Sequence, residues 1–207
     1  MDFGQVGTIY CVGRNYVAHA KELDNEVPSE PLIFLKSKTA LRGLNPGLLA
    51  FPKDTFHYEA EVILHVARDH EMGEPVSQDS YRHVSLGIDL TRRSVQSVLK
   101  SKGEPWTLSK SFVGSAIIGK RYTCEELGPI DSLIFEFWLN GKRKQIGDCQ
   151  KMIFGFDVIG NYINTFSPLK RGDLIFTGTP EGVGEIRQGD TFQLKFPRAG
   201  FLEEGIL

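Results

Sequence analysis

Long apolar runs are absent from this chain of 207 residues. No stretch approaches the roughly 18 consecutive apolar residues that a membrane-spanning helix needs. The first residues, Met1 to Gln5, also lack the basic and apolar regions of a signal peptide. The sequence therefore predicts no membrane partner and a cytoplasmic location.

Cysteine is scarce, and an excess of basic residues is missing. The three cysteines, Cys11, Cys124 and Cys149, are far apart and form no CxxC pair, which argues against a zinc site and a disulfide framework. Lys and Arg number 24 against 26 Asp and Glu, a net charge of −2. A broad nucleic-acid surface would need a basic excess, so we expect no nucleic-acid partner.

What is present is an ordinary globular composition, with 41% hydrophobic residues and no internal repeat. At roughly 150 residues per domain, we expect one domain over residues 1–207. Strand signals outnumber helix signals and do not alternate with them, so the fold class is predicted to be α+β, a mixed and mostly antiparallel sheet structure with peripheral helices.

The expected strands are 8–13, 32–35, 58–67, 83–90, 133–139, 143–147, 174–177 and 191–196. The expected helices are 14–24, 91–102 and 149–166, with Thr91 as a possible N-cap of the second. Asn140-Gly141 is typical of a two-residue type I′ hairpin turn.

Three carboxylates form the first candidate site. Glu59 and Glu61 are two apart in a predicted strand, so both side chains point to the same face. Asp89 lies at the end of another predicted strand, just before a helix. Oxygen ligands suit Mg²⁺, Mn²⁺ or Ca²⁺, but a solvated strand face and a helix-capping Asp89 explain the same pattern.

Two further segments carry candidate chemistry. His19 and Glu22 are three apart on a predicted helix, so the carboxylate could orient the imidazole as a general base, although a short helix can hold such a pair by chance. Residues 177–184 form a glycine-rich segment after a strand, where Thr179 could bind an anionic oxygen or simply belong to a turn.

Six segments, in order from about residue 8 to 196, together resemble the fumarylacetoacetate hydrolase family. They are Val12-Gly13-Arg14-Asn15-Tyr16-Val17-Ala18-His19-Ala20-Lys21-Glu22, Pro31-Leu32-Ile33-Phe34-Leu35-Lys36, Tyr58-Glu59-Ala60-Glu61-Val62, Asp89-Leu90-Thr91-Arg92-Arg93-Ser94-Val95-Gln96, Trp106-Thr107-Leu108-Ser109-Lys110-Ser111-Phe112, and Gly172-Asp173-Leu174-Ile175-Phe176-Thr177-Gly178-Thr179-Pro180-Glu181-Gly182-Val183-Gly184. Val113 and Ile88 depart from the Asp and Asn that many members have there.

The resemblance implies a β-roll fold, a homodimer, and Mg²⁺ or Mn²⁺ held by Glu59, Glu61 and Asp89. It implies a lid near residues 16–24 that carries His19 and Glu22 for water activation. The remaining implied residues are the catalytic Lys110 and the substrate-binding set Arg14, Tyr16, Lys36, Arg93, Gln96 and Thr179.

The compact members of the family act on acylpyruvates or oxaloacetate, so the expected partner is a small 2-keto or 2,4-diketo acid. We expect first a metal-dependent hydrolase that cleaves a C–C bond of acylpyruvates to give pyruvate and a carboxylic acid. An oxaloacetate decarboxylase or a 2-keto-acid isomerase or tautomerase is the alternative on the same site. A metal-dependent nuclease and a non-catalytic binding protein are the competing classes outside the family chemistry.

Overall fold

The computed structural model describes residues 5–45, 47 and 55–207. The signal-peptide prediction rests on Met1 to Gln5, and residues 1–4 of that segment lie outside the described part. An eight-stranded sheet has the order β2-β1-β12-β5-β6-β8-β3, with β9 paired to β6. The order of a second, four-stranded sheet is β11-β10-β14-β15, and three short strands form β13-β4-β7. The β1–β12 and β3–β8 pairs are parallel and the other strand pairs are antiparallel.

The strands are β1 Ile9–Gly13, β2 Leu32–Lys36, β3 Leu41–Arg42, β4 Phe56–Tyr58, β5 Ala60–Val66, β6 Tyr81–Asp89, β7 Thr91–Arg92, β8 Ala116–Ile118, β9 Tyr122–Thr123, β10 Ile134–Leu139, β11 Lys142–Asp148, β12 Leu174–Phe176, β13 Gly184–Ile186, β14 Thr191–Phe196 and β15 Phe201–Ile206. The helices are α1 Val17–Glu22, α2 Arg93–Ser101, α3 Thr107–Lys110, α4 Cys124–Leu127 and α5 Phe156–Asn164. The mixed, mostly antiparallel architecture that the sequence predicts is confirmed.

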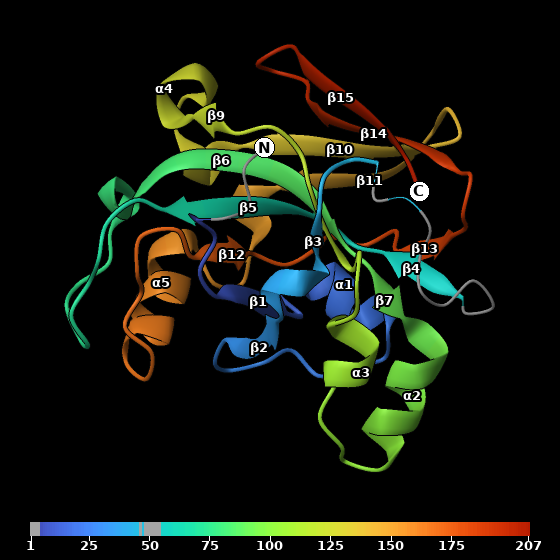
Figure 1. Cartoon of the computed structure of the whole chain (residues 1–207), viewed down its shortest axis with the longest axis horizontal. Helices are drawn as coiled ribbons and strands as arrows, with labels where there is room; N and C mark the ends of the chain where they lie inside the picture. The colour runs from blue at the N-terminus through green and yellow to red at the C-terminus, as the bar shows by residue number, and fades with distance from the viewer. Residues whose placement is uncertain (1–4, 46, 48–54) are drawn as a thin grey trace.

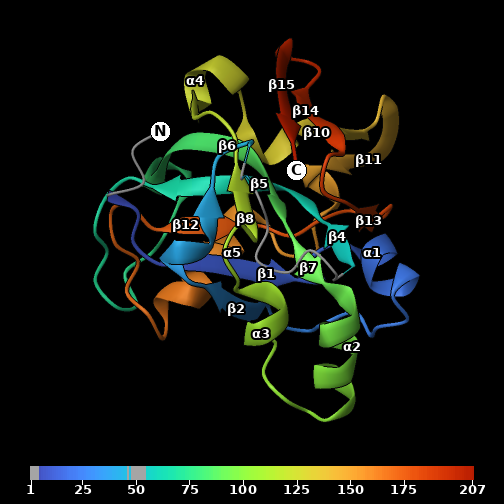
Figure 2. The same ribbon diagram turned by 45° about the vertical axis from the view of Figure 1, so that its right-hand side comes forward.

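The curved strands β5 and β6 lie at the centre of the molecule, with β10, β14 and β15 above them and β1 and β2 below (Figures 1 and 2). The main core fills the space between the two larger sheets, because β5 contributes Val62 and Leu64 to the cluster that also holds Phe135 and Phe137 of β10. Ile63 of β5 belongs to a second buried cluster. Strand β5 is therefore buried on both faces, which excludes a solvated face for its acidic residues.

The hairpin prediction is confirmed at Asn140-Gly141, which joins β10 to β11. Asn140 has φ 48° and Gly141 has φ 74°, and a type I′ turn requires positive φ at both central residues. The turn sets the register in which β11 returns along β10, and β11 carries Gln145 into the core.

Two helix predictions need correction. The segment 149–166 is not one helix: a 3-10 turn, Cys149–Lys151, is followed by extended chain, and α5 begins after Gly155. Asn15 holds the extended part, because Ile153 N donates to its carbonyl and Phe154 N donates to its side chain. Thr91 does not cap α2 either, since the cap position is Arg92 and no side chain bonds there.

In the part of the chain that the structure describes, no helix combines the length and the apolar character that crossing a bilayer requires.

Gly87 tests the packing of the central strands. A Cβ there would lie 2.3 Å from the carbonyl oxygen of Ile117 and 2.4 Å from Cδ1 of Ile63. We predict that Gly87→Ala lowers the free energy of unfolding by about 3 kcal/mol, since neither the β8 backbone nor the core can move away cheaply. Urea denaturation measures the change. Gly155→Ala is the control, because a Cβ there meets nothing within 4 Å. Equal midpoints for the two variants would contradict the described approach of β6 and β8.

Candidate active site

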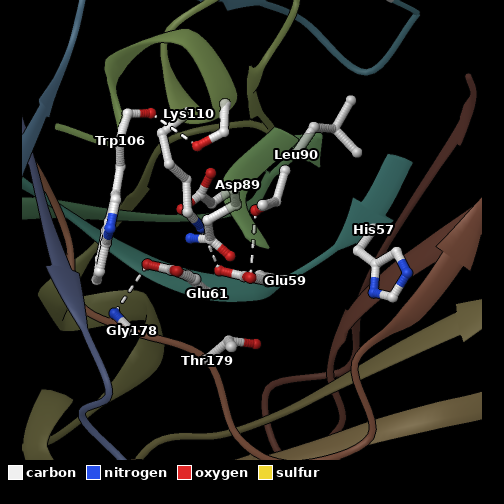
Figure 3. Close-up of polar contacts among 12 residues, drawn as sticks. His57, Glu59, Glu61, Asp89, Leu90, Trp106, Lys110, Gly178 and Thr179 are labelled. Carbon is white, nitrogen blue, oxygen red and sulfur yellow. Dashed lines mark hydrogen bonds and ion pairs between the residues drawn. The ribbon is translucent and has the colours of Figure 1, made fainter. Parts of the chain in front are cut away.

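The three predicted acidic residues converge at one end of the central strand pair. Glu59 immediately precedes β5, Glu61 is its second residue, and Asp89 ends β6. The antiparallel register pairs Glu61 with Gly87, and Asp89 N donates to the Glu59 carbonyl at 2.8 Å. One carboxylate oxygen from each residue lies within 4.8 Å of the others, and all three side chains are buried (Figure 3). The solvated-face and helix-capping interpretations are therefore wrong.

Cationic side chains from three other segments surround two of the carboxylates. Lys110 Nζ lies 2.6 Å from Glu59 Oε2 and 2.7 Å from Asp89 Oδ2. Lys36 Nζ lies 2.6 Å from Asp89 Oδ1, and the Arg93 guanidinium lies 2.6 Å from Glu59 Oε1. Two of the three buried carboxylates, those of Glu59 and Asp89, thus face three cationic groups, and such pairing is what makes buried charge tolerable.

Glu61 is the exception, because it contacts no cation among the described residues. Its Oε2 accepts a hydrogen bond from Gly178 N at 2.8 Å. Burial, together with the charges of Asp89 and Glu59, raises the pKa of Glu61 well above its usual range. Burial acts the same way on Glu59, but Lys110 and Arg93 outweigh it and hold the pKa of Glu59 far below normal. The protein thus leaves one carboxylate of the triad without a compensating positive charge.

A hard divalent cation fits this donor set. Carboxylate oxygens are the ligands that Mg²⁺ and Mn²⁺ prefer, and the charge of Glu61 is the one that the protein's own cations do not balance. Glu59, Glu61 and Asp89 would hold it. Because these residues come from one antiparallel strand pair, the β5–β6 register fixes their spacing.

The short helix α1 brings the second predicted pair to the same place. His19 is buried and lines the cleft beside Glu59 and Lys110, and its Nδ1 lies 3.6 Å from Glu22 Oε2. Burial lowers the pKa of His19 below its usual value, with Glu59 opposing the shift only in part. A neutral imidazole can accept a proton, so the geometry is suitable for a general base.

Glu22 has a further contact. Its two carboxylate oxygens each accept from Gly182 N at 3.1 Å, so the helix that carries His19 is attached to the glycine-rich segment after β12.

The cleft between these elements is narrow, with a volume of about 40 Å³. Of the predicted substrate-binding residues, Arg14, Arg93 and Gln96 line it, together with the catalytic candidates His19 and Lys110. A wider hollow of about 800 Å³ between β6, β9 and α4 contains none of the acidic triad.

The other three predicted binding residues are buried behind the cleft wall. Lys36 donates to the carbonyls of Leu90, Lys110 and Ser115 in addition to its ion pair with Asp89. Tyr16 is buried at the N-terminus of α1, and burial raises its pKa.

Thr179 directs its hydroxyl inward. The hydroxyl donates to the carbonyl of Ala60 at 2.8 Å and accepts from Gln145 at 2.8 Å. Figure 3 places Thr179 beside Glu59 and Glu61. Within the described structure its hydroxyl proton is thus committed to the strand that carries the acidic residues.

Sequence reasoning missed several residues that shape the site. Gln145 accepts from Ala60 N and donates to Thr179 and to the Pro180 carbonyl, so it joins β5 to the glycine-rich segment. Thr91 donates to Glu59 Oε1 at 3.2 Å. Lys100 lines the cleft from α2. Of these residues, only Thr91 could have been found from the local sequence, because it lies two residues after Asp89. The hydrogen-bond partners of Gln145 lie 34 to 85 residues away in the sequence.

Comparison with known proteins agrees with this geometry. The profile of the family described as fumarylacetoacetate (FAA) hydrolase C-terminal matches residues 8–207. The oxaloacetate tautomerase FAHD1, mitochondrial, of Bos taurus is 36% identical over 187 residues, which are 89% of this chain and 85% of that protein. The mitochondrial oxaloacetate decarboxylase of Dictyostelium discoideum is 36% identical over 192 residues, which are 89% of this chain and 86% of that protein.

Among solved structures, the fumarylpyruvate hydrolase from Pseudomonas aeruginosa, in complex with Mn²⁺ and pyruvate, superimposes with a TM-score of 0.86 at 30% identity. The match covers 97% of this chain and 89% of that one. The family profile and the relatives each cover most of the chain, and the chain belongs to the fumarylacetoacetate hydrolase family.

Proposed function

We propose that this protein is a divalent-metal-dependent enzyme that interconverts the keto and enol forms of oxaloacetate. The observation that carries the proposal is the buried group of Glu59, Glu61 and Asp89 with the neutral His19 beside it. Enolisation of a 2-keto acid needs one group that accepts a proton from carbon and positive charge near the keto oxygen. The names of the relatives from Bos taurus and Dictyostelium discoideum support oxaloacetate as the substrate.

Glu59, Glu61 and Asp89 would hold Mg²⁺ or Mn²⁺, which supplies Lewis-acid stabilisation of negative charge on a keto oxygen. Lys110 faces the cleft with its ammonium between Glu59 and Asp89, so it would add positive charge where the enolate oxygen forms. Arg93 and Gln96, which are hydrogen-bonded to each other at 2.6 Å, would orient the substrate carboxylate.

His19 would move the proton. In the keto-to-enol direction it takes a proton from the carbon next to the keto group, and the keto oxygen gains one. Glu22 would keep the imidazole aimed into the cleft, because it lies near His19 Nδ1 and is fixed by Gly182 N. Burial supports this role, since it lowers the pKa of His19 and so favours the unprotonated imidazole.

Hydrolysis of acylpyruvates is the second candidate, and the His19–Glu22 pair is the observation that favours it. Here His19 would take a proton from water, the hydroxide would add to the distal carbonyl, and the C–C bond would break to give pyruvate enolate and a carboxylic acid. The fumarylpyruvate hydrolase structure supports this chemistry on the same fold. The sequence alone favours this reaction; the relatives' names favour the tautomerase.

The first prediction concerns the metal. Chelation should abolish oxaloacetate tautomerisation, and Mg²⁺ or Mn²⁺ should restore it. We expect Glu61→Gln to lower kcat at least ~100-fold and to weaken metal binding, because the carboxylate without a cationic neighbour is lost. Enol absorbance and calorimetric titration with Mg²⁺ measure the two effects. Glu125→Gln, an exposed acid on α4, is the control. Full turnover in chelator would rule out the metal-dependent proposal.

The second prediction separates the two reactions. Wild-type protein should exchange keto and enol oxaloacetate faster than it releases pyruvate from acetylpyruvate, with both rates measured on one preparation. His19→Asn should lower tautomerisation by roughly 100- to 10,000-fold, the usual contribution of a general base. His83→Asn, at a half-buried position away from this cleft, is the matched control. Rapid acetylpyruvate cleavage without tautomerisation would instead favour the hydrolase.

A further inference from the structure

The cleft lining carries two positive charges that have no acidic partner among the described residues. Arg14 lies between β1 and α1, and Lys100 lies in the last turn of α2. Both line the cleft that contains His19 and Lys110. Neither residue is one of the three acids of the site or one of the cations Lys36, Arg93 and Lys110 that contact them.

Arg14 has no hydrogen-bonding or ion-pairing partner in the part of the chain that the structure describes, although it is half-buried. Its backbone has φ 58°, a left-handed conformation that is uncommon for a residue other than glycine. Such strained positions concentrate at functional sites, where the surrounding structure holds them. The conformation here fixes the point from which the guanidinium enters the cleft.

Lys100 has one polar partner and no acidic one. Its Nζ donates to Asn25 Oδ1 at 2.8 Å, and the amide supplies no negative charge. Burial and the neighbouring charges of Arg14 and Arg93 lower the pKa of Lys100. Lys100 therefore lies near other positive charges, and a bound anion would reduce the repulsion between them.

Among the described residues, no acid is available for that role inside the cleft. Glu59 is the one acidic residue among the described residues that line it, and its oxygens already accept from Arg93, Thr91 and Lys110. A guanidinium and an ammonium side by side suit a carboxylate, which the planar guanidinium can bind through two parallel hydrogen bonds.

We propose that Arg14 and Lys100 form a subsite for the second carboxylate of the substrate, so that the enzyme selects 2-keto dicarboxylates over 2-keto monocarboxylates. The inference rests on the proposed function, because it takes the 2-keto-acid end to lie at Lys110 and the acidic group. It adds which residues bind the second carboxylate of the substrate and which class of substrate they favour.

Two stable five-carbon acids test the subsite without turnover. 2-Oxoglutarate and 2-oxopentanoate share the 2-keto-acid end and differ in a terminal carboxylate or methyl group. Calorimetric titration of the Mg²⁺-loaded protein should show at least about tenfold tighter binding of 2-oxoglutarate, as expected for hydrogen bonds between charged groups. Arg14→Gln and Lys100→Gln should each reduce this ratio at least fivefold, mainly through weaker binding of 2-oxoglutarate.

Lys102→Gln is the matched control, because it removes the same charge at the exposed end of α2, away from the cleft lining. It should leave the ratio unchanged. Equal binding of the two acids by wild-type protein, binding of neither, or an equal loss for both acids in the variants would overturn the subsite. Discrimination without metal-dependent tautomerisation would uphold the subsite and reject the proposed reaction.

Discussion

The site depends on a buried cluster of opposite charges. Glu59, Glu61 and Asp89 come from the β5–β6 pair, and Lys36, Arg93 and Lys110 come from β2, α2 and α3. Removing so much charge from water is costly unless each group is paired, so these elements must meet at fixed distances. Lys36 joins several of these segments, since its ammonium contacts Asp89 and the backbone carbonyls of Leu90, Lys110 and Ser115.

The same cluster gives the cleft its polarity. Glu59 lines it together with its partners Arg93 and Lys110, while Arg14 and Lys100 line it without acidic partners among the described residues. A 2-keto dicarboxylate has the complementary arrangement, with oxygens for a cation at one end and a carboxylate at the other. A cation held by Glu59, Glu61 and Asp89, together with Arg14 and Lys100 along the cleft, would orient such a molecule before any proton moves, and orientation of this kind lowers the barrier to reaction.

The sequence predicted the centre of this site better than its surroundings. Period-two spacing placed Glu59 and Glu61 on one face, and the motif order placed Asp89, His19 and Lys110 near them; all five are close together. Gln145 and Lys100 were missed, because their contacts join segments that only the folded chain brings together. The predicted helix 149–166 failed for a similar reason, since the distant Asn15 holds the extended chain before Gly155. Apolar spacing reports the buried face of a segment and not its long-range hydrogen bonds.

Tautomerisation and C–C hydrolysis would each pass through the enolate of a 2-keto acid, so the acidic cluster alone does not decide between them. The decision rests on whether His19 meets a substrate carbon or a water molecule in the closed cleft. Glu22 matters for both reactions, because it contacts the base and a second segment. Its carboxylate lies near His19 Nδ1 and accepts a hydrogen bond from Gly182 N on the glycine-rich segment. Gln145 fixes the start of that segment against β5. The position of His19 therefore depends on β5 through Glu22, the glycine-rich segment and Gln145. A shift of the glycine-rich segment would change which atoms His19 can reach.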